Sequence, residues 1–420
     1  MSDTITYYGQ QAQKEQSTHA WLASLQSQAL KTLEEKGFPS RHDEDWKYTP
    51  VLPWLKEPFV YQRQPAVDLE RVDDNRPQGQ CVVLYNGTVL NYQELALPAG
   101  VLLLPLSLAL QEHAALVQSY LGQAIESTHG FHALNTAFIQ AGIFLYIPEG
   151  VVIETPLLFL HWQDKAMQSI QLRHVIVAQA NAQATIIEEY QGIGQEVYFT
   201  NTITEMWLAA QAEVTHYKIQ RESKKAYHIG HLAVKQKAKS TFASHSLSLG
   251  AALARSDLSI YLEEEQASCL MNGIYAPGDG QHVDHHTKVH HLVPHCVSEQ
   301  DYKGILQGRA KGVFNGTVYV APDAQQTKAG QQNKNLLLSP QAEINTKPQL
   351  EIFADDVVCS HGATVGQLDE EALFYLASRG IGKAQAHQYL VHAFAKDNLR
   401  LIPHKDWADW MTDLLLQQLG

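Results

Sequence analysis

The spacing of hydrophobic and polar residues divides the chain into three parts. In the first part, apolar residues within 21–33 recur at steps of three and four, which predicts an amphipathic helix that ends at Gly37. Residues 107–125 follow the same spacing and predict another helix. The Asn86-Gly87 pair between two apolar runs predicts a β-hairpin.

The second part, from about Gly142 to Asp369, consists of short alternating runs rich in Val, Ile, Thr and Tyr, with no long helical period. A weak repeat runs through it, in which an alanine follows a polar residue just before a strand. The alanines are Ala184, Ala212, Ala238 and Ala267, at intervals of 28, 26 and 29 residues. Such intervals favour the coils of a parallel β-solenoid over a β-sandwich, which would show more hairpin turns.

The third part is helical again. Asp369 can cap a helix whose first turn is acidic, Gly380 and Gly382 end it, and two further helices follow, the last one after Pro403. The predicted organisation is therefore a largely helical region with a short β segment (1–141), a β-solenoid core (142–368) and a C-terminal helical domain (369–420).

Composition restricts the possible partners and location. A chain of 420 residues with a formal net charge of −13 is a poor nonspecific ligand for nucleic acid or anionic membranes. The first 16 residues lack a basic and then apolar signal segment, and the longest apolar run, 100–110, is too short to span a bilayer. We expect a soluble, cytoplasmic protein whose four cysteines stay reduced.

Histidines are densest in residues 282–296. Alternation along a strand would place His286 and His290 on one face and His285 and His291 on the other. These imidazoles could bind zinc, copper or iron, which would make the chain a stand-alone metal-binding protein. They could instead form polar ladders between solenoid coils. The ladder is favoured because no carboxylate pattern besides Asp284 could orient the imidazoles toward a metal.

Cys359 and His361 form the second candidate site. Their separation of two residues places both side chains on one face of a strand, with Ser360 on the other. The pair could be packing residues, metal ligands, or a nucleophile with its base. Two ligands cannot complete a metal site, so a metal would need ligands from elsewhere or from another chain.

Enzymatic motifs are missing from the sequence. Gly382-Lys383 lacks the upstream glycine and the following Ser or Thr of a phosphate-binding loop, so any ATPase would have to be a partner. Polysaccharide lyases often use parallel β-solenoids, but they need carboxylates clustered with Arg or Lys on one face, and this pattern is not seen.

Five segments, spread over most of the chain, resemble the SufB/SufD family of scaffold proteins in SUF iron–sulfur cluster assembly. They are DEDWKYTPV (43–51), IPEGVVIETPLLF (147–159), HVDHHTKVHHLVPHCVSEQDYKGIL (282–306), GVFNGTVYVAPDAQQTKAGQQNKNLLLS (312–339) and AEINTKPQLEIFADDVVCSHGATVGQLDEEALFYLASRGI (342–381). In SufB proteins glutamates flank the corresponding histidine, and a cysteine occupies the region equivalent to 335–344. The residues from Cys359 to Gly362 are therefore similar to the SufD branch.

The resemblance implies a right-handed parallel β-helix flanked by helices. It also implies a non-catalytic scaffold that pairs with a SufB-like paralogue near the C-terminal coils and binds a SufC-like ABC-type ATPase through its C-terminal helices. A transient iron–sulfur cluster would form at the SufB–SufD interface, with His361 as a ligand and Cys359 as a metal-binding thiol of less defined role, and would pass to apoproteins.

Further partners follow from the same resemblance. Sulfide would come transiently from a cysteine desulfurase and its carrier. Reduced flavin is a family expectation for the whole complex, without a recognisable site in this sequence. Self-pairing of the chain in the absence of its partner is left open.

Overall fold

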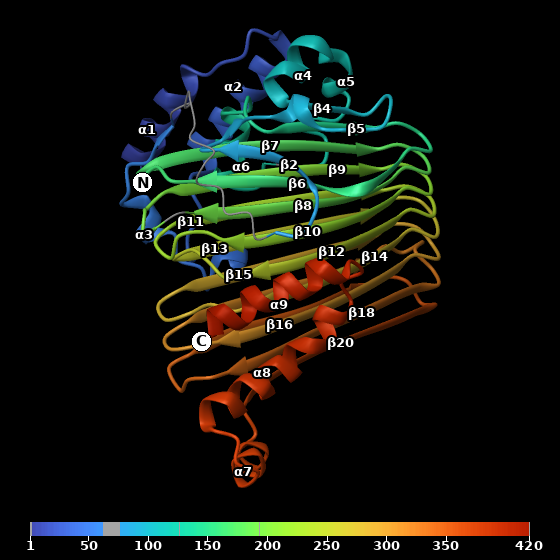
Figure 1. Cartoon of the computed structure of the whole chain (residues 1–420). Coiled ribbons are helices and arrows are strands. Elements are labelled where there is room, and N and C mark those ends of the chain that lie inside the picture. The colour runs from blue at the N-terminus through green and yellow to red at the C-terminus, as the bar shows by residue number, and fades with distance from the viewer. Residues whose placement is uncertain (1, 62–75, 126, 193, 420) are drawn as a thin grey trace.

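The computed structural model describes residues 2–61, 76–125, 127–192 and 194–419. Its centre is a parallel β-solenoid of about eight turns, in which successive strands alternate between two sheets (Figure 1). The predicted solenoid is thus confirmed, with helices at both ends. Within the described ranges, no helix is both long and apolar enough to cross a membrane.

The two sheets are named here by their strands. Sheet A contains β4 (Leu102–Pro105), β5 (Ile143–Ile147), β7 (Gln168–Ala178), β9 (Phe199–Leu208), β11 (Tyr227–Gln236), β13 (Leu253–Leu262), β15 (His282–His291), β17 (Lys311–Val320) and β19 (Glu343–Ile352), with β1 (Val60–Tyr61) beside β7. Sheet B contains β3 (Thr88–Val89), β2 (Gln80–Tyr85), β6 (Val152–Gln163), β8 (Gln183–Gly192), β10 (Glu213–Arg221), β12 (Thr241–Ser248), β14 (Ser268–Tyr275), β16 (Val297–Leu306), β18 (Thr327–Leu337) and β20 (Val357–Gln367).

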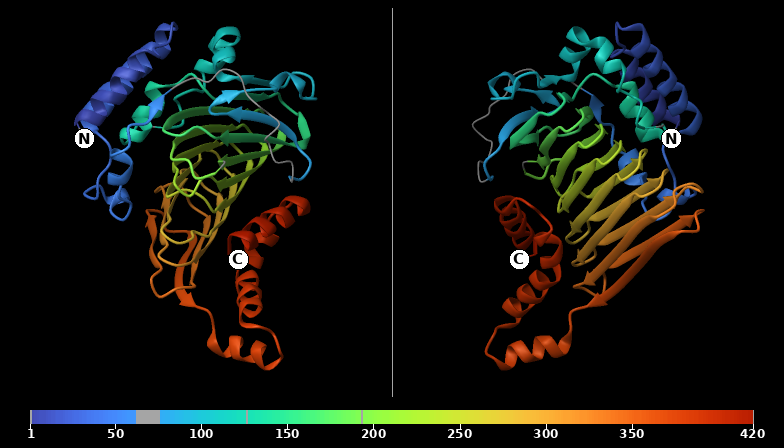
Figure 2. Two further views of the ribbon diagram at one scale, coloured as in Figure 1. Left: turned by 60° about the vertical axis from the view of Figure 1, so that its left-hand side comes forward. Right: turned by 90° about the vertical axis from the view of Figure 1, so that its right-hand side faces the viewer.

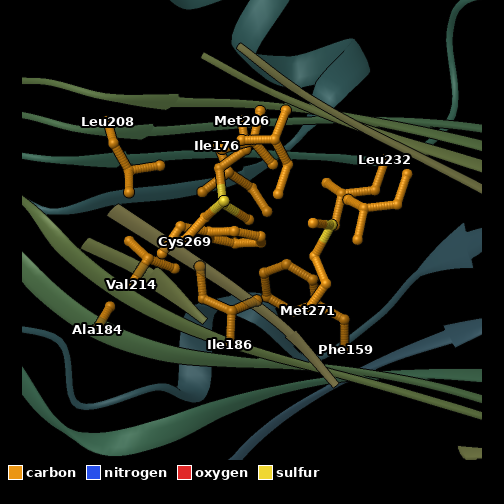
Figure 3. Packing of buried hydrophobic residues seen from close by; sticks show 14 of the residues in the cluster. Phe159, Ile176, Ala184, Ile186, Met206, Leu208, Val214, Leu232, Cys269 and Met271 are labelled. Carbon is orange, nitrogen blue, oxygen red and sulfur yellow. The ribbon is translucent and has the colours of Figure 1, made fainter. Parts of the chain in front are cut away.

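The main core lies between the two sheets. Every second residue of each strand points into this lumen, because side chains alternate along a strand. Phe159 and Ile186 of sheet B meet Ile176 and Met206 of sheet A there (Figure 3). Apolar layers from both sheets therefore interdigitate inside the coils and hold the stack together.

A residue with a left-handed backbone conformation lies one or two positions before each strand of sheet B from β8 to β18. These residues are Asn181, Gln211, Lys239, Gln266, His295 and Gln326, with φ between 57° and 62°. Each costs about 1 kcal/mol relative to glycine in that conformation. The stack supplies compensating hydrogen bonds, since the N–H of Asn181 donates to the carbonyl of Ala210 in the next coil at 3.0 Å.

The sequence repeat is explained by this turn, with one correction. The left-handed residues recur at intervals of 30, 28, 27, 29 and 31, and a fully buried small residue follows each. Ala212 and Ala267 occupy this buried position. Ala184 and Ala238 do not, because the strand register places Ala182 and Ser240 there instead. The predicted coil length was correct, but two of the four alanines were out of phase.

The N-terminal helices cover the outer face of sheet A (Figure 2). Trp54 stacks on Tyr8 at a centroid distance of 5.5 Å and contacts Phe199 of β9 at 4.9 Å, which anchors the helices to the sheet. The helices are α1 (Ser2–Gln13), α2 (Ala20–Lys36), α3 (Leu52–Leu55), α4 (Leu106–Glu112), α5 (Ala114–Gln118) and α6 (Gly130–Ala137).

Three N-terminal predictions have clear outcomes. Helix α2 ends at Gly37 as expected, and Asn86 and Gly87 form the hairpin turn between β2 and β3 with positive φ. The prediction of one continuous helix over 107–125 was wrong. The helix is broken at His113, whose φ of −131° and ψ of 35° separate α4 from α5.

The C-terminal helices are α7 (Glu370–Ser378), α8 (Lys383–Arg400) and α9 (Lys405–Leu419). The Asp369 side chain accepts hydrogen bonds from the N–H groups of Glu371 and Ala372, so the predicted N-cap is confirmed. Helices α8 and α9 pack Leu399 and Trp407 on the outer face of sheet B. Helix α7 buries no residue and projects past the last coil (Figure 1).

Candidate metal centre at the last coil

The solenoid ends in an uncovered coil formed by β19 and β20. Among the described strands, β20 pairs with β18 alone and β19 with β17 alone, so each leaves one backbone edge unpaired. Large apolar side chains are exposed there, with Phe353 at 61%, Val358 at 71% and Val365 at 50%. An exposed apolar strand edge is a surface to which another chain can add.

Cys359 and His361 both lie on β20 at this end. They are in register with Ala329 and Gln331 of β18, which are buried in the lumen. The two side chains therefore share the lumen-facing side of the strand, as predicted, with Ser360 on the opposite side. Cys359 is half-buried and His361 is exposed, because no further coil covers them.

The surroundings of Cys359 are apolar. The thiol packs against a cluster that includes Val318, Val320 and Ala329. Burial raises the pKa of Cys359, opposed by a hydrogen bond with the backbone of Ala329. A thiol in such surroundings needs a metal ion or a base to become a nucleophile or a ligand. In the described structure no hydrogen bond joins Cys359 to His361, so the nucleophile-and-base reading has no geometric support.

The opposite wall of the open end comes from β19. Thr346, Pro348 and Leu350 continue the lumen-facing positions of Phe314, Gly316 and Val318 from the coil below. The Thr346 hydroxyl is buried without a partner among the described residues. No group of three His, Cys, Asp or Glu side chains converges at this end in the described part of the chain. The open rim therefore carries two side chains of types that can bind a metal, Cys359 and His361.

One such group does exist deeper in the lumen. Ligand atoms of His161, His174 and Glu188 lie within 4.8 Å of one another, and all three residues are buried. The N–H of Ile143 donates to Nδ1 of His174 at 3.1 Å, so the neutral ring carries its proton on Nε2 and has no lone pair left for a metal.

Glu188 is already engaged as well. It accepts hydrogen bonds from Tyr190 at 2.5 Å, from Thr204 at 2.9 Å and from His216 at 3.3 Å. Burial lowers the pKa of His161 and His174, which keeps both rings neutral. The geometry favours a hydrogen-bonded polar layer. Sequence reasoning missed it, although polar residues at lumen-facing positions between apolar ones were a visible signal.

The histidines of 282–296 contact neighbouring coils. The predicted faces are confirmed, with His285 and His291 toward the lumen and His286 and His290 on the outer side. The His290 ring stacks on Tyr261 of one neighbouring coil at 4.6 Å and lies 5.7 Å from Tyr319 of the other. His291 Nε2 lies 2.8 Å from the Ser298 hydroxyl. His286 Nε2 lies 3.0 Å from the buried carboxylate of Asp284. His290 thus stacks between coils as the ladder interpretation expects, whereas His291 and His286 are bonded within their own coil. Within the described structure these histidines do not converge on one point.

Comparisons with known proteins agree with this architecture. Residues 161–394 match the family model described as "SUF system FeS cluster assembly, SufBD core domain", and residues 2–158 match "SufBD protein N-terminal region". The chain is 33% identical over 382 residues to an iron–sulfur cluster assembly SufBD family protein of Synechocystis, covering 87% of this chain and 84% of that protein.

Relatives with two different names are similar to the chain. It is 31% identical over 379 residues to the iron–sulfur cluster assembly protein SufD of Escherichia coli, covering 88% of this chain and 86% of the relative. It is 25% identical over 369 residues to the iron–sulfur cluster assembly protein SufB of Bacillus subtilis, covering 86% and 77%.

Proposed function

Because the chain belongs to the SufB/SufD family of SUF iron–sulfur cluster assembly, we propose that it is a SufD-type, non-catalytic scaffold subunit. The run from Cys359 to Gly362, without flanking glutamates, supports the SufD branch. The scaffold would hold a nascent cluster together with a SufB-like paralogue and release it to apoproteins.

The open last coil is the observation that carries this proposal. It combines an unpaired strand edge, exposed apolar side chains and two side chains that can bind iron. A second solenoid that meets this edge would cover Val365 and Phe353 and bring its own ligands to His361. Imidazole and thiolate both bind iron, and a ligand set shared between two chains can come apart when the cluster leaves.

His361 and Cys359 differ in their suitability as ligands. His361 is exposed on the rim, so its ring can turn toward a cluster without moving the strand. Cys359 is half-buried with a raised pKa, so it would need a bound metal to stabilise its thiolate. We therefore assign His361 as the ligand from this chain and Cys359 as an accessory thiol.

The C-terminal unit 369–420 is proposed to dock a SufC-like ABC-type ATPase. Phe374 and Tyr375 of α7 are 76% and 58% exposed, and Tyr389 of α8 is 50% exposed. Aromatic side chains in this position are typical anchors of a protein interface. The neighbouring α8 and α9 are firmly packed on sheet B, so they can transmit a movement of the ATPase to the solenoid.

The remaining partners belong to the assembled complex. A cysteine desulfurase and its carrier would supply sulfide on the SufB-like side, and a reduced flavin bound to the complex would supply electrons. We propose that assembly takes place in the cytoplasm.

A reconstitution tests the function. The chain alone, and the complex with its SufB-like and SufC-like partners, would be incubated anaerobically with iron, a desulfurase, cysteine and a reductant that converts the delivered sulfur to sulfide. We expect an oxygen-sensitive cluster absorption in the complex and little stable iron in the chain alone. A stable cluster of normal yield in the isolated chain would contradict the shared site.

A further inference from the structure

In sheet B, one lumen-facing residue of each strand from β10 to β20 lies in register with the next, and this row of residues ends at His361. From the interior outward, its members are His216, Ser244, Met271, Gln300, Gln331 and His361. Paired residues of adjacent parallel strands are about 4.8 Å apart, so Gln331 lies directly beneath His361.

The carboxamide of Gln331 is buried without a partner. The residue is 1% exposed, and neither its oxygen nor its nitrogen has a hydrogen bond in the described structure. A buried amide that lacks partners destabilises the folded chain, whereas leucine or methionine would fill the same space without this cost. Packing alone therefore does not explain a glutamine at this position.

The opposite sheet makes room for this carboxamide. A Cβ atom at Gly316 of β17 would lie 1.6 Å from Nε2 of Gln331, so a side chain at position 316 would collide with the amide. The residue in register above Gly316 is Pro348, which has no N–H to offer. The carboxamide thus extends across the lumen without finding a partner there.

The strand positions that adjoin His361 offer few groups that could hold its ring. Cys359 and Ala363 share its face on β20, and Thr346 lies on the opposite wall. On the lumen-facing side of β18, the side-chain oxygen of Asn333 already accepts a hydrogen bond from Asn335 at 2.6 Å, whereas the carbonyl oxygen of Gln331 is unpaired in the described structure. A histidine that binds a metal usually donates its second ring N–H to a carbonyl or carboxylate, which fixes the tautomer and the ring orientation.

Building on the function proposed above, we propose that Gln331 is a positioning residue for the cluster ligand His361. Its carboxamide oxygen accepts a hydrogen bond from the ring N–H that does not bind iron, and the second ring nitrogen is held toward the cluster. The unpaired amide of the isolated chain is then satisfied when the cluster site is assembled.

The test uses the reconstituted complex with Gln331→Leu and with the acceptor-retaining variant Gln331→Glu. The matched control is Gln300→Leu, which alters a buried glutamine one coil deeper that does not adjoin His361. Cluster half-life and the nitrogen couplings in pulsed electron paramagnetic resonance of the reduced cluster would be measured, together with the melting temperature of each isolated chain.

We expect Gln331→Leu to melt at the same temperature as the wild type or higher. In the complex we expect this variant to shorten the cluster half-life by about tenfold and to change the nitrogen couplings. Gln331→Glu should restore much of both properties, and Gln300→Leu should alter neither. If Gln331→Leu does not fold, Gln331→Met takes its place, because methionine keeps an unbranched chain of similar length.

Two outcomes would overturn the inference in different ways. If His361→Ala prevents cluster formation but Gln331→Leu leaves half-life and couplings unchanged, the carboxamide is satisfied by water and the positioning role is wrong. If His361→Ala itself behaves like the wild type, the proposed cluster site is wrong and the role of Gln331 with it.

Discussion

Buried carboxylates hold the N-terminal segment on the solenoid. Arg255 lies 3.8 Å from the centre of the Trp46 ring and pairs with Asp257 at 2.9 Å and with Asp284 at 2.9 Å. Burial by itself would raise the pKa of Asp257, but Arg255 and two nearby histidines lower it from 3.8 to about 2. The folded chain therefore favours the charged carboxylate more than the unfolded chain does.

This shift predicts a pH dependence of stability. Because the folded-state pKa is depressed, the contribution is complete above about pH 4 and is lost as the pH falls toward 2. It amounts to about 2 kcal/mol for Asp257. In urea unfolding between pH 5 and pH 2, Asp257→Asn should lose less stability than the wild type by about this amount. Equal losses would show that Asp257 does not contribute to the acid sensitivity.

At the residue scale, the sequence predicted the relative placement of the candidate ligands Cys359 and His361 but not their surroundings. Alternation correctly placed Cys359 and His361 on one face, because the side-chain period of a strand is independent of the fold. Their exposure could not be predicted, since it arises from the absence of a coil beyond β20. Gln331 was also missed, because its relation to His361 depends on a register across 30 residues of chain.

At the scale of elements, the turns explain why the solenoid was visible in the sequence only as a weak repeat. The left-handed position is occupied by Asn, Gln, Lys and His in different coils, and glycine does not mark it. The small buried residue after it varies among Ala, Ser, Cys and Thr. The number of residues per coil could therefore be predicted from the sequence, but the exact position of each turn could not. For this reason Ala184 and Ala238 were assigned to the wrong position in their coils.

Helix α7 and the start of α8 form the element that we expect to bind the ATPase subunit. The double variant Phe374→Ala, Tyr375→Ala should leave the melting temperature unchanged, because α7 buries no residue. Binding to a SufC-like partner should weaken by about tenfold or more, as is usual for aromatic interface anchors. The measurement is the dissociation constant by calorimetry.

The matched control for this experiment is Leu52→Ala, which removes a side chain that is 62% exposed on the N-terminal region. It should bind the ATPase subunit as the wild type does. Undiminished binding of the double variant would move the docking site away from α7.

At the scale of the whole molecule, the two ends of the solenoid differ. The N-terminal end is closed by the antiparallel strands β3 and β4 and by the helical layer, whereas the C-terminal end is open at β19 and β20 (Figure 2). This asymmetry leaves the C-terminal end of the described stack uncovered, and the candidate ligands are located on β20 at that end. The architecture therefore suits a subunit that is completed by a partner at one end.

A charge at the open edge should prevent this pairing. Val365 faces the lumen on β20 and is 50% exposed, so Val365→Lys should not unfold the chain. An unpaired lysine buried in the interface would weaken binding of a SufB-like partner by about 100-fold or more. Val152→Lys, at a 46% exposed valine in β6, is the control and should bind normally. Equal affinity of both variants would mean that the two solenoids meet elsewhere.

The central claim is that His361 donates to iron which a partner chain also binds. Its most direct test is Mössbauer spectroscopy of the reconstituted complex with wild-type His361, with His361→Ala, with Cys359→Ala and with the same-strand control Thr364→Ala. The account predicts an assembled complex in every case, at least about tenfold less cluster iron for His361→Ala, a smaller loss for Cys359→Ala and none for the control. A His361→Ala complex that builds the wild-type amount of cluster with an unchanged spectrum would contradict it.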